Sequence, residues 1–220
     1  MSLNRRERNE TLPCSENPQR RKSESMSRSI GLLLVVASLY CAVAASAEVE
    51  TWQIDPVHSS AQFSVRHLGI STVRGAFSKV SGTVKYDATD PRKGAVDAAI
   101  EAASLDTRVT MRDDDLRGAD FFDVAKFPNI TFKSKRIEAA GAGKLKITGD
   151  LTIHGVTNEV VLAVDGPSAV VKGESDERRG VLATTKINRK DFGVSGASAM
   201  VGDEITITID VELTRPLAAK

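Results

Sequence analysis

Residues 205–213 read Ile-Thr-Ile-Thr-Ile-Asp-Val-Glu-Leu, so apolar side chains alternate with Thr, Asp and Glu. A period of two places alternate side chains on opposite faces of an extended chain, and it is typical of a β-strand with one buried face. Residues 144–153 repeat the pattern, with an apolar face that Gly149 interrupts. A glycine at such a position indicates a bulge or the close approach of another segment.

Most of the chain after residue 48 follows the same alternation. Further stretches of this kind lie at 63–65, 73–77, 80–86, 96–102, 130–132, 160–164 and 181–187, with a turn at His154-Gly155. One helix is predicted at 111–122, with Thr110 or Asp113 as its N-cap. Because no second helix alternates with the strands, a parallel α/β sheet is disfavoured. The sequence therefore predicts an all-β sandwich or barrel of about eight antiparallel strands, and a barrel of that size either fills with side chains or holds one small ligand.

The composition is that of an ordinary globular protein. The chain has 220 residues, of which 41% are hydrophobic and 27% are charged, and its formal net charge is +1. These values argue against a disordered chain and against a polytopic membrane protein. A net charge close to zero also argues against nucleic-acid binding, which needs a concentrated excess of Lys and Arg.

The first 47 residues differ from the rest. Residues 1–25 are polar and charge-mixed, which suggests a disordered extension or an upstream segment misassigned ahead of a true start at Met26. Residues 26–47 contain Arg28, a short apolar run and Ala45-Ser46-Ala47, which are the parts of a secretory signal peptide. A buried helix is the alternative interpretation. Cleavage after Ala47 would leave one domain at 48–220, without either of the two cysteines.

Several motifs resemble the signatures of the YceI-like family, in the family's order. The opening one is Trp52-Gln-Ile-Asp55-Pro-Val-His58-Ser59-Ser-Ala-Gln-Phe63-Ser-Val65-Arg-His67. The later ones lie at 71–77, 120–123, 127–132, 149–157, 187–193 and 201–204, and together they cover nearly all of residues 50–215. The resemblance implies an extended, lipocalin-like antiparallel barrel of eight strands, with one or two short helices at an end, in a protein exported to the periplasm.

The resemblance also implies a long central pore that binds a polyisoprenoid or an isoprenoid quinone. The residues that we expect to bind this ligand are Phe63, Val65, His67, Val73, Phe77, Ile100, Phe121, Phe132, Leu151, Ile153, Arg189 and Phe192. Arg189 could meet a phosphorylated head group, because guanidinium binds phosphate with two parallel hydrogen bonds. The alternative is a structural ion pair of Arg189 with Asp55 or Asp191.

The chain offers few residues for catalysis or metal binding. Its three histidines, His58, His67 and His154, lie in separate motifs without the spacing of metal ligands. Asp55, His58 and Ser59 have the residue types of a hydrolase triad. On an extended strand, however, Asp55 and His58 would point to opposite faces. We therefore expect no metal, no catalytic residue and no cofactor besides the bound lipid.

Three classes of function remain open. The first is non-catalytic binding, transport or storage of a long isoprenoid in the periplasm. The second is an enzyme of isoprenoid or quinone metabolism, and the third is a stress-response accessory protein with a packed core. A transient membrane contact and a homodimer are further possible partnerships.

The exported protein is expected to begin near Glu48, because Ala45-Ser46-Ala47 follows a short apolar run as in cleavable leaders. Edman sequencing of periplasmic material measures this directly. A mature product that begins at Met1 or Met26 would contradict the expectation.

Overall fold

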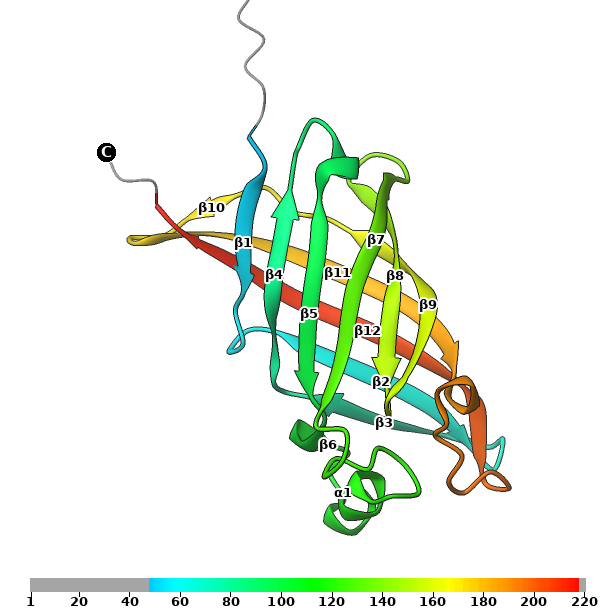
Figure 1. The fold of residues 1–220 in the computed structure, drawn as a ribbon. Helices are drawn as coiled ribbons and strands as arrows, with labels where there is room; N and C mark the ends of the chain where they lie inside the picture. The colour runs from blue at the N-terminus through cyan, green and yellow to red at the C-terminus, as the bar shows by residue number, and fades with distance from the viewer. Residues whose placement is uncertain (1–47, 218–220) are drawn as a thin grey trace, which may run out of the picture. The chain divides into compact units, whose positions relative to one another are not determined.

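The computed structural model describes residues 48–217, whose strands form one antiparallel sheet of 12 strands (Figure 1). The expected extension at 1–25 and signal peptide at 26–47 lie outside the described residues. The strands are β1 (Glu50–Ile54), β2 (Ser60–His67), β3 (Ser71–Phe77), β4 (Val80–Tyr86), β5 (Ala95–Glu101), β6 (Leu105–Asp106), β7 (Asn129–Ala139), β8 (Lys144–Ile153), β9 (Val156–Asp165), β10 (Val171–Lys172), β11 (Asp176–Asn188) and β12 (Val201–Pro216).

Pairing of β11 with β12 closes the sheet into a barrel. Among the described residues, the closed circuit runs β11-β9-β8-β7-β5-β4-β1-β12 and back to β11. The chain bends between β1 and β2, so that both strands pair with the same edge of β12, β1 at Leu213–Thr214 and β2 at residues 201–210. β3 and β6 continue from β2, and β10 pairs with β11. The predicted all-β, eight-stranded antiparallel barrel is confirmed.

The alternating stretches form the strands that they predict. β8 has the predicted bounds, and β12 extends past the predicted segment at both ends. His154 and Gly155, with φ of 51° and 77°, make the predicted turn between β8 and β9. The sequence interpretation missed β1, because only Trp52 and Ile54 of its residues are apolar and buried.

Gly149 allows the close approach that its position predicted. A Cβ atom there would lie 2.5 Å from the ring of Phe132 and 2.5 Å from the carbonyl oxygen of Lys133. The pairing of β7 with β8 shifts register opposite this glycine, between Ser134 and Arg136. The glycine therefore lets an aromatic ring lie against the backbone of the neighbouring strand.

The helix is shorter than predicted, and its caps differ. The α-helix α1 spans Thr110–Arg117, and Val109 occupies the N-cap position without a side-chain hydrogen bond. The carboxylate of Asp113 accepts hydrogen bonds from the N–H and hydroxyl of Thr107 instead. Residues 118–124 fold back with hydrogen bonds to the last carbonyl groups of the helix, which brings Phe122 into an edge contact with Phe77 at 5.5 Å. Packing of this partly buried ring on Phe77 thus accompanies an end to the helix that comes earlier than its composition suggests.

Three short 3-10 helices complete the described secondary structure: η1 (Pro91–Lys93), η2 (Ala102–Ser104) and η3 (Arg189–Phe192). Figure 1 shows α1 at the end of the barrel where β5 ends, and β10 at the opposite end. No helix within residues 48–217 is long and apolar enough to cross a membrane.

Asp87 is fully buried after β4 and organises the following turn. Its carboxylate accepts hydrogen bonds from the N–H and hydroxyl of Thr89 and from the N–H of Asp90, at 2.7–2.9 Å. These donors, led by the Thr89 hydroxyl, lower the pKa of Asp87 from 3.8 to about 2. Hydrogen bonds to the charged form have this effect, because protonation would remove an acceptor from the turn.

Replacement of Asp87 by Asn should therefore destabilise the protein in a pH-dependent way. The folded pKa lies below the unfolded one, so the stabilisation by the carboxylate is complete above about pH 4 and is lost as the pH falls towards 2. Urea unfolding of the wild type and Asp87→Asn between pH 2 and pH 7 measures the difference. The difference in the free energy of unfolding between the two proteins should shrink as the pH falls from 7 to 2. A difference that does not change with pH would show that the carboxylate charge contributes nothing to stability.

Candidate functional site

The inward side chains of the barrel enclose a cavity of about 230 Å³. β12 contributes Ile205, Ile207 and Ile209, while β11 contributes Val181 and Ala183. These are the alternate residues of each strand, so the period of two seen in the sequence becomes the inner wall of the barrel. The same pattern makes the cavity continuous across strands that are far apart in the chain.

The cavity wall is almost entirely apolar. Its polar or partly polar members are Gln62, Lys85, Tyr86, Thr131, Thr185 and Arg189. Of these, the Thr185 hydroxyl already donates a hydrogen bond to the carbonyl oxygen of Val161 at 2.8 Å. A wall of this kind favours apolar guests, because it offers few groups to replace the water around a polar one.

Most residues expected to bind a ligand line this cavity. They are Phe63, Val65, Phe77, Ile100, Phe121, Phe132, Leu151, Ile153, Arg189 and Phe192. His67 and Val73 do not line it. Both have the inward parity of their strands, but His67 pairs with Ser71 near the turn of the β2–β3 hairpin, and Val73 is only half-buried beside Val65. Alternation along a strand predicts which face of the sheet a side chain lies on, but it does not predict how far the cavity extends along that strand.

Several lining residues were absent from the expected set. They include Ile147, Leu162, Val164, Val181, Ala183, Ile187, Ile205, Ile207, Ile209, Val211 and Leu213. Their signal was present in the alternation of 144–153, 160–164, 181–187 and 205–213. The sequence analysis lacked the closure of the sheet, which brings the inward residues of every strand in the circuit to the same cavity.

Two aromatic rings lie against glycines and leave room in the cavity. A Cβ atom on Gly75 would lie 2.5 Å from the ring of Phe63, its direct partner across β2 and β3. A Cβ atom on Gly149 of β8 would likewise lie 2.5 Å from the ring of Phe132, although the direct partner of Gly149 on β7 is Ser134. Both rings line the cavity. Because neither glycine has a side chain, each ring can pack against the backbone of the neighbouring strand.

Four charged residues gather around Trp52 at the β10 end of the barrel. Glu50, Glu177, Arg179 and Arg215 occupy the inward parity of β1, β11 and β12, beyond the apolar lining. Arg215 contacts Glu50 at 3.0 Å and Glu177 at 2.7 Å, and Arg179 lies 3.7 Å from Glu50. The guanidinium groups of Arg179 and Arg215 lie over the Trp52 ring, at 5.5 and 4.4 Å. We call these four residues the ionic plug.

The ionic plug is largely buried at this end of the barrel, with side-chain exposures of 11–33%. Trp52 is fully buried, and Glu177 is 9% exposed. The hydrogen bond from Arg215 lowers the pKa of Glu177, which keeps the carboxylate charged. Paired charges of this kind are costly to desolvate, so this end disfavours an apolar guest. The sequence analysis did not identify the ionic plug. Its charged residues on β11 and β12 nevertheless occupy the same alternate positions as the inward apolar residues of these strands.

Arg189 is engaged with the protein backbone. It is buried at the start of η3, and its guanidinium donates hydrogen bonds of 2.8–3.1 Å to the carbonyl oxygens of Val194, Gly196, Val201 and Gly202. An ion pair with Asp203 at 3.6 Å is longer. The expected pairing with Asp55 or Asp191 is replaced by these contacts. The arrangement holds the η3–β12 loop in place and leaves little donor capacity for a phosphate.

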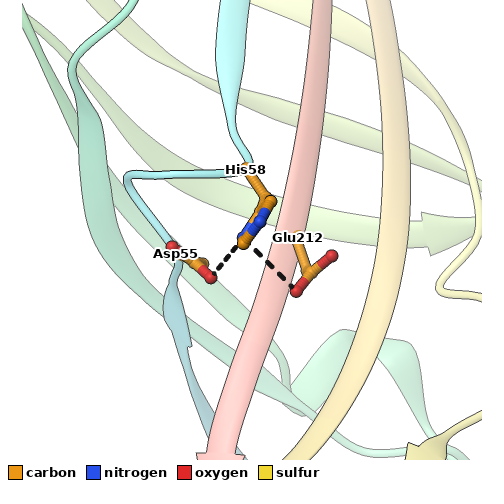
Figure 2. Close-up of side chains that lie close together, drawn as sticks. All are labelled: Asp55, His58 and Glu212. Atoms are coloured by element: carbon orange, nitrogen blue, oxygen red, sulfur yellow. Dashed lines mark hydrogen bonds and ion pairs between the residues drawn. The ribbon is translucent and has the colours of Figure 1, made fainter.

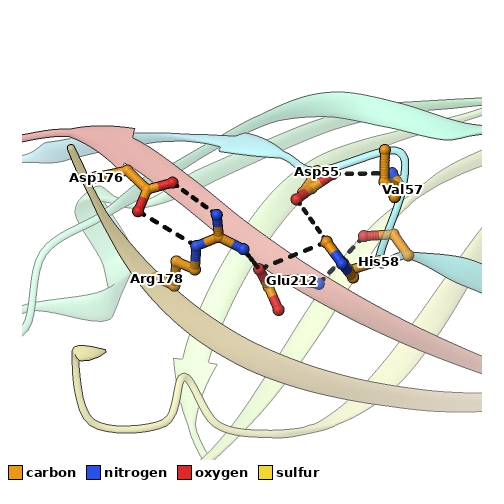
Figure 3. Close-up of polar contacts among 7 residues, drawn as sticks. Asp55, Val57, His58, Asp176, Arg178 and Glu212 are labelled. Atoms are coloured by element: carbon orange, nitrogen blue, oxygen red, sulfur yellow. Dashed lines mark hydrogen bonds and ion pairs between the residues drawn. The ribbon is translucent and has the colours of Figure 1, made fainter. Parts of the chain in front are cut away.

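A polar cluster lies on the outer surface of the barrel, where the chain bends between β1 and β2 (Figure 2). The Nδ1 atom of His58 lies 2.9 Å from Asp55 Oδ2 and 3.8 Å from Glu212 Oε1. Figure 3 shows that Arg178 links the cluster to Asp176, and Arg178 contacts Glu212 at 2.7 Å. The bend at 55–59 brings Asp55 and His58 together, which corrects the expectation that they point to opposite faces.

This cluster lacks the geometry of a hydrolase triad. The hydroxyl of Ser59 accepts a hydrogen bond from the Glu212 N–H at 3.1 Å, and Ser59 is buried. The hydrogen bond between Asp55 and His58 lowers the pKa of Asp55 and raises the pKa of His58. The imidazole is 54% exposed. Asp55, His58 and Glu212 could offer three ligand atoms to a metal ion, but Arg178 already pairs with Glu212.

Known proteins resemble this chain in sequence over most of its length. Residues 52–213 match the YceI-like domain. A UPF0312 protein of Vibrio cholerae is 34% identical over 181 residues, which cover 81% of this chain and 94% of that protein. A UPF0312 protein of Shewanella baltica is 33% identical over 195 residues, which cover 86% of this chain and 100% of that protein.

Solved structures show the same fold. BcnA of Burkholderia cenocepacia is similar with a TM-score of 0.64 and 28% identity, over 72% of this chain and 98% of that one. The YceI protein of Campylobacter jejuni has a TM-score of 0.61 and 35% identity, over 68% and 89%. A polyisoprenoid-binding domain from Saccharophagus degradans shares the fold alone, with a TM-score of 0.56 at 16% identity over 77% and 100%.

Replacement of Arg189 by Ala should lower the free energy of unfolding by about 3–5 kcal/mol, because it leaves several buried carbonyl groups without a donor. Arg178→Ala, which removes a solvent-accessible ion-paired guanidinium, should cost far less, because such pairs contribute little to stability. Urea denaturation compares the two variants. A stable Arg189→Ala protein with weakened affinity for a phosphorylated lipid would instead assign the guanidinium to ligand binding.

Proposed function

The chain belongs to the YceI-like family, and on that premise we propose that it is a non-catalytic protein that binds a long-chain isoprenoid lipid, a polyisoprenoid or an isoprenoid quinone, inside its barrel. Its role would be transport or storage of that lipid in the periplasm, after removal of the leader at 1–47. The observation that carries the proposal is the apolar cavity enclosed by the strands.

The chemistry of the cavity wall supports a hydrocarbon guest. Strands β7, β8, β9, β11 and β12 all contribute branched apolar side chains to one continuous surface. Each CH₂ group that leaves water contributes about 0.8 kcal/mol to binding. A long isoprenoid can therefore bind tightly through apolar contacts alone. Affinity would rise with chain length until the chain outgrows the barrel.

The relatives support the same class of ligand. The Saccharophagus degradans structure, which shares the fold, is described as a polyisoprenoid-binding domain. In the present chain the rings of Phe63 and Phe132 pack against Gly75 and Gly149, where a side chain would meet them at 2.5 Å, and both rings line the cavity.

The polar groups support binding over catalysis. The Asp55–His58 pair lies on the outer surface at the β1–β2 bend, while the ligand cavity is inside the barrel. Arg189, the charged residue of the lining that comes from η3, is bonded to backbone carbonyl groups. A reaction on a bound lipid would need a positioned acid, base or nucleophile within hydrogen-bond reach of it.

Organic extraction of the purified protein, followed by mass spectrometry, tests the proposal directly. Ala183, which is 6% exposed and lines the cavity, gives the sharpest variant. Ala183→Phe should fill the lumen and lower the bound isoprenoid per protein by about tenfold, because an added ring displaces several CH₂ groups from contact with the wall.

Leu182→Phe is the matched control, since Leu182 is the neighbouring residue on β11 and is 41% exposed on the outer face. It should retain the lipid content of the wild type. Thermal unfolding of both variants verifies that they fold. Wild-type protein that yields no isoprenoid on extraction, or equal lipid in both variants, would contradict binding inside the barrel.

A further inference from the structure

Three apolar side chains stand exposed together at the end of the barrel away from the ionic plug. Leu68 and Ile70, in the turn of the β2–β3 hairpin, are 55% and 80% exposed, and Met200, just before β12, is 50% exposed. The two segments are joined, because the Leu68 N–H donates a hydrogen bond to the Met200 carbonyl oxygen at 2.7 Å. In Figure 1 this hairpin turn lies beside the loop that precedes β12. We call these three residues the tip patch.

Leu68 is unfavourable for the isolated protein in two ways. It has a φ of 50° and is followed by Gly69 with a φ of 70°, and Ile70 N–H closes the turn on His67 O at 3.1 Å. Two central residues with positive φ favour Asn-Gly or Gly-Gly, since a side chain such as Leu crowds the backbone there. The same Leu exposes its side chain to water. A residue that costs both conformational energy and solvation suggests a surface contact.

Two arginines lie on the strands of the hairpin that carries the tip patch, Arg66 on β2 and Arg74 on β3. The carboxylates that follow Met200 on β12 are already paired, Asp203 with Lys190 at 2.9 Å and Glu204 with Lys186 at 2.8 Å. Arg74 is exposed on the outer face of β3, and no carboxylate lies within ion-pair distance of it among residues 48–217. Arg66 braces the hairpin through Thr72 Oγ1 and the Gly69 carbonyl oxygen, at 2.8 and 2.6 Å.

The tip patch adjoins the cavity. Val201, the residue after Met200, lines the cavity and pairs with His67. Val65, three residues before Leu68, also lines it. The ionic plug lies at the other end of β12, about 45 Å away at 3.3 Å per residue of extended chain. The tip patch therefore lies next to cavity-lining residues at the end of β12 away from the ionic plug.

From these observations we infer that the tip patch is a docking surface for a lipid bilayer that contains anionic phospholipids. Leu68, Ile70 and Met200 enter the interfacial region, while Arg74 contacts the phosphate groups. The role of docking in lipid transfer rests on the proposed function, whereas docking itself does not. A second copy of the chain fits less well, because three side chains are far below the roughly 1,200 Å² buried in a specific interface, and the basic residues would face each other.

Sedimentation with vesicles of phosphatidylethanolamine that contain one quarter phosphatidylglycerol tests the inference on the full protein. Ile70→Ser should weaken vesicle binding by about tenfold, the effect of one large apolar side chain that stays in water. Val57→Ser is the matched control, because Val57 is also 80% exposed but lies at the β1–β2 bend beside Asp55. It should bind as the wild type does.

Two further variants separate docking from folding. Leu68→Asn should raise the Tm by about 2–4 °C, because Asn suits a positive φ, and should weaken vesicle binding at the same time. If Leu68 had only a structural role, its replacement would lower the Tm and weaken vesicle binding together. Arg74→Gln should weaken binding to the anionic vesicles by about fivefold and reduce its salt dependence, as expected for one basic residue at an anionic surface.

The outcomes distinguish this inference from the proposed function. Equal vesicle binding by Ile70→Ser and Val57→Ser overturns docking, whatever lipid the protein contains. Ile70-dependent vesicle binding by a protein that yields no isoprenoid on extraction supports docking and refutes the proposed function. A dimer in analytical ultracentrifugation that Ile70→Ser converts to a monomer, without vesicle binding by the wild type, assigns the patch to a second copy and overturns the inference.

Discussion

The hydrogen-bonded ladder between β11 and β12 is the contact on which the described structure depends. It runs without interruption from Asp176 opposite Pro216 to Asn188 opposite Glu204. Because the other strands of the circuit already form a continuous sheet, this one pairing closes the eight-stranded barrel and encloses its inner face. Amphipathic strands that would otherwise need a second layer then bury their apolar faces against each other and around the cavity. The enclosed space is thus a consequence of closure.

β12 also connects the chemically distinct parts of the barrel. Its residues on one side, from Ile205 to Leu213, line the cavity, and Arg215 continues that side into the ionic plug. On the other side Glu212 joins the outer polar cluster at the β1–β2 bend. The strand therefore separates apolar and charged groups by alternation across the sheet and by position along it. This separation keeps water-binding groups out of the region that suits a hydrocarbon ligand.

The two ends of the barrel are built differently. At the β10 end, paired charges and Trp52 close the interior, and their mutual contacts favour a fixed arrangement. At the other end, Arg189 organises a loop from residues that carry no charge, and apolar side chains reach the surface. A plug of paired charges opposes entry of a hydrocarbon more than exposed apolar side chains do, because the plug loses hydration or ion pairs when such a guest approaches. The two ends of the cavity therefore differ in how readily they accept a hydrocarbon.

The amino-acid sequence by itself determined most of the strands, their buried faces and the family, because period-two alternation and short motifs are local properties. It also placed the turn at His154-Gly155 and the close approach at Gly149. Helix α1 ended early, since the packing of Phe122 on Phe77 is a contact between distant segments. Closure decided which inward residues surround the cavity and which, like His67 and Val73, lie beyond it. The ionic plug, the bonds of Arg189 and the meeting of Leu68 with Met200 join residues that are far apart in the chain. Only the tertiary structure could decide them, because charge and burial depend on neighbours that local periodicity does not specify.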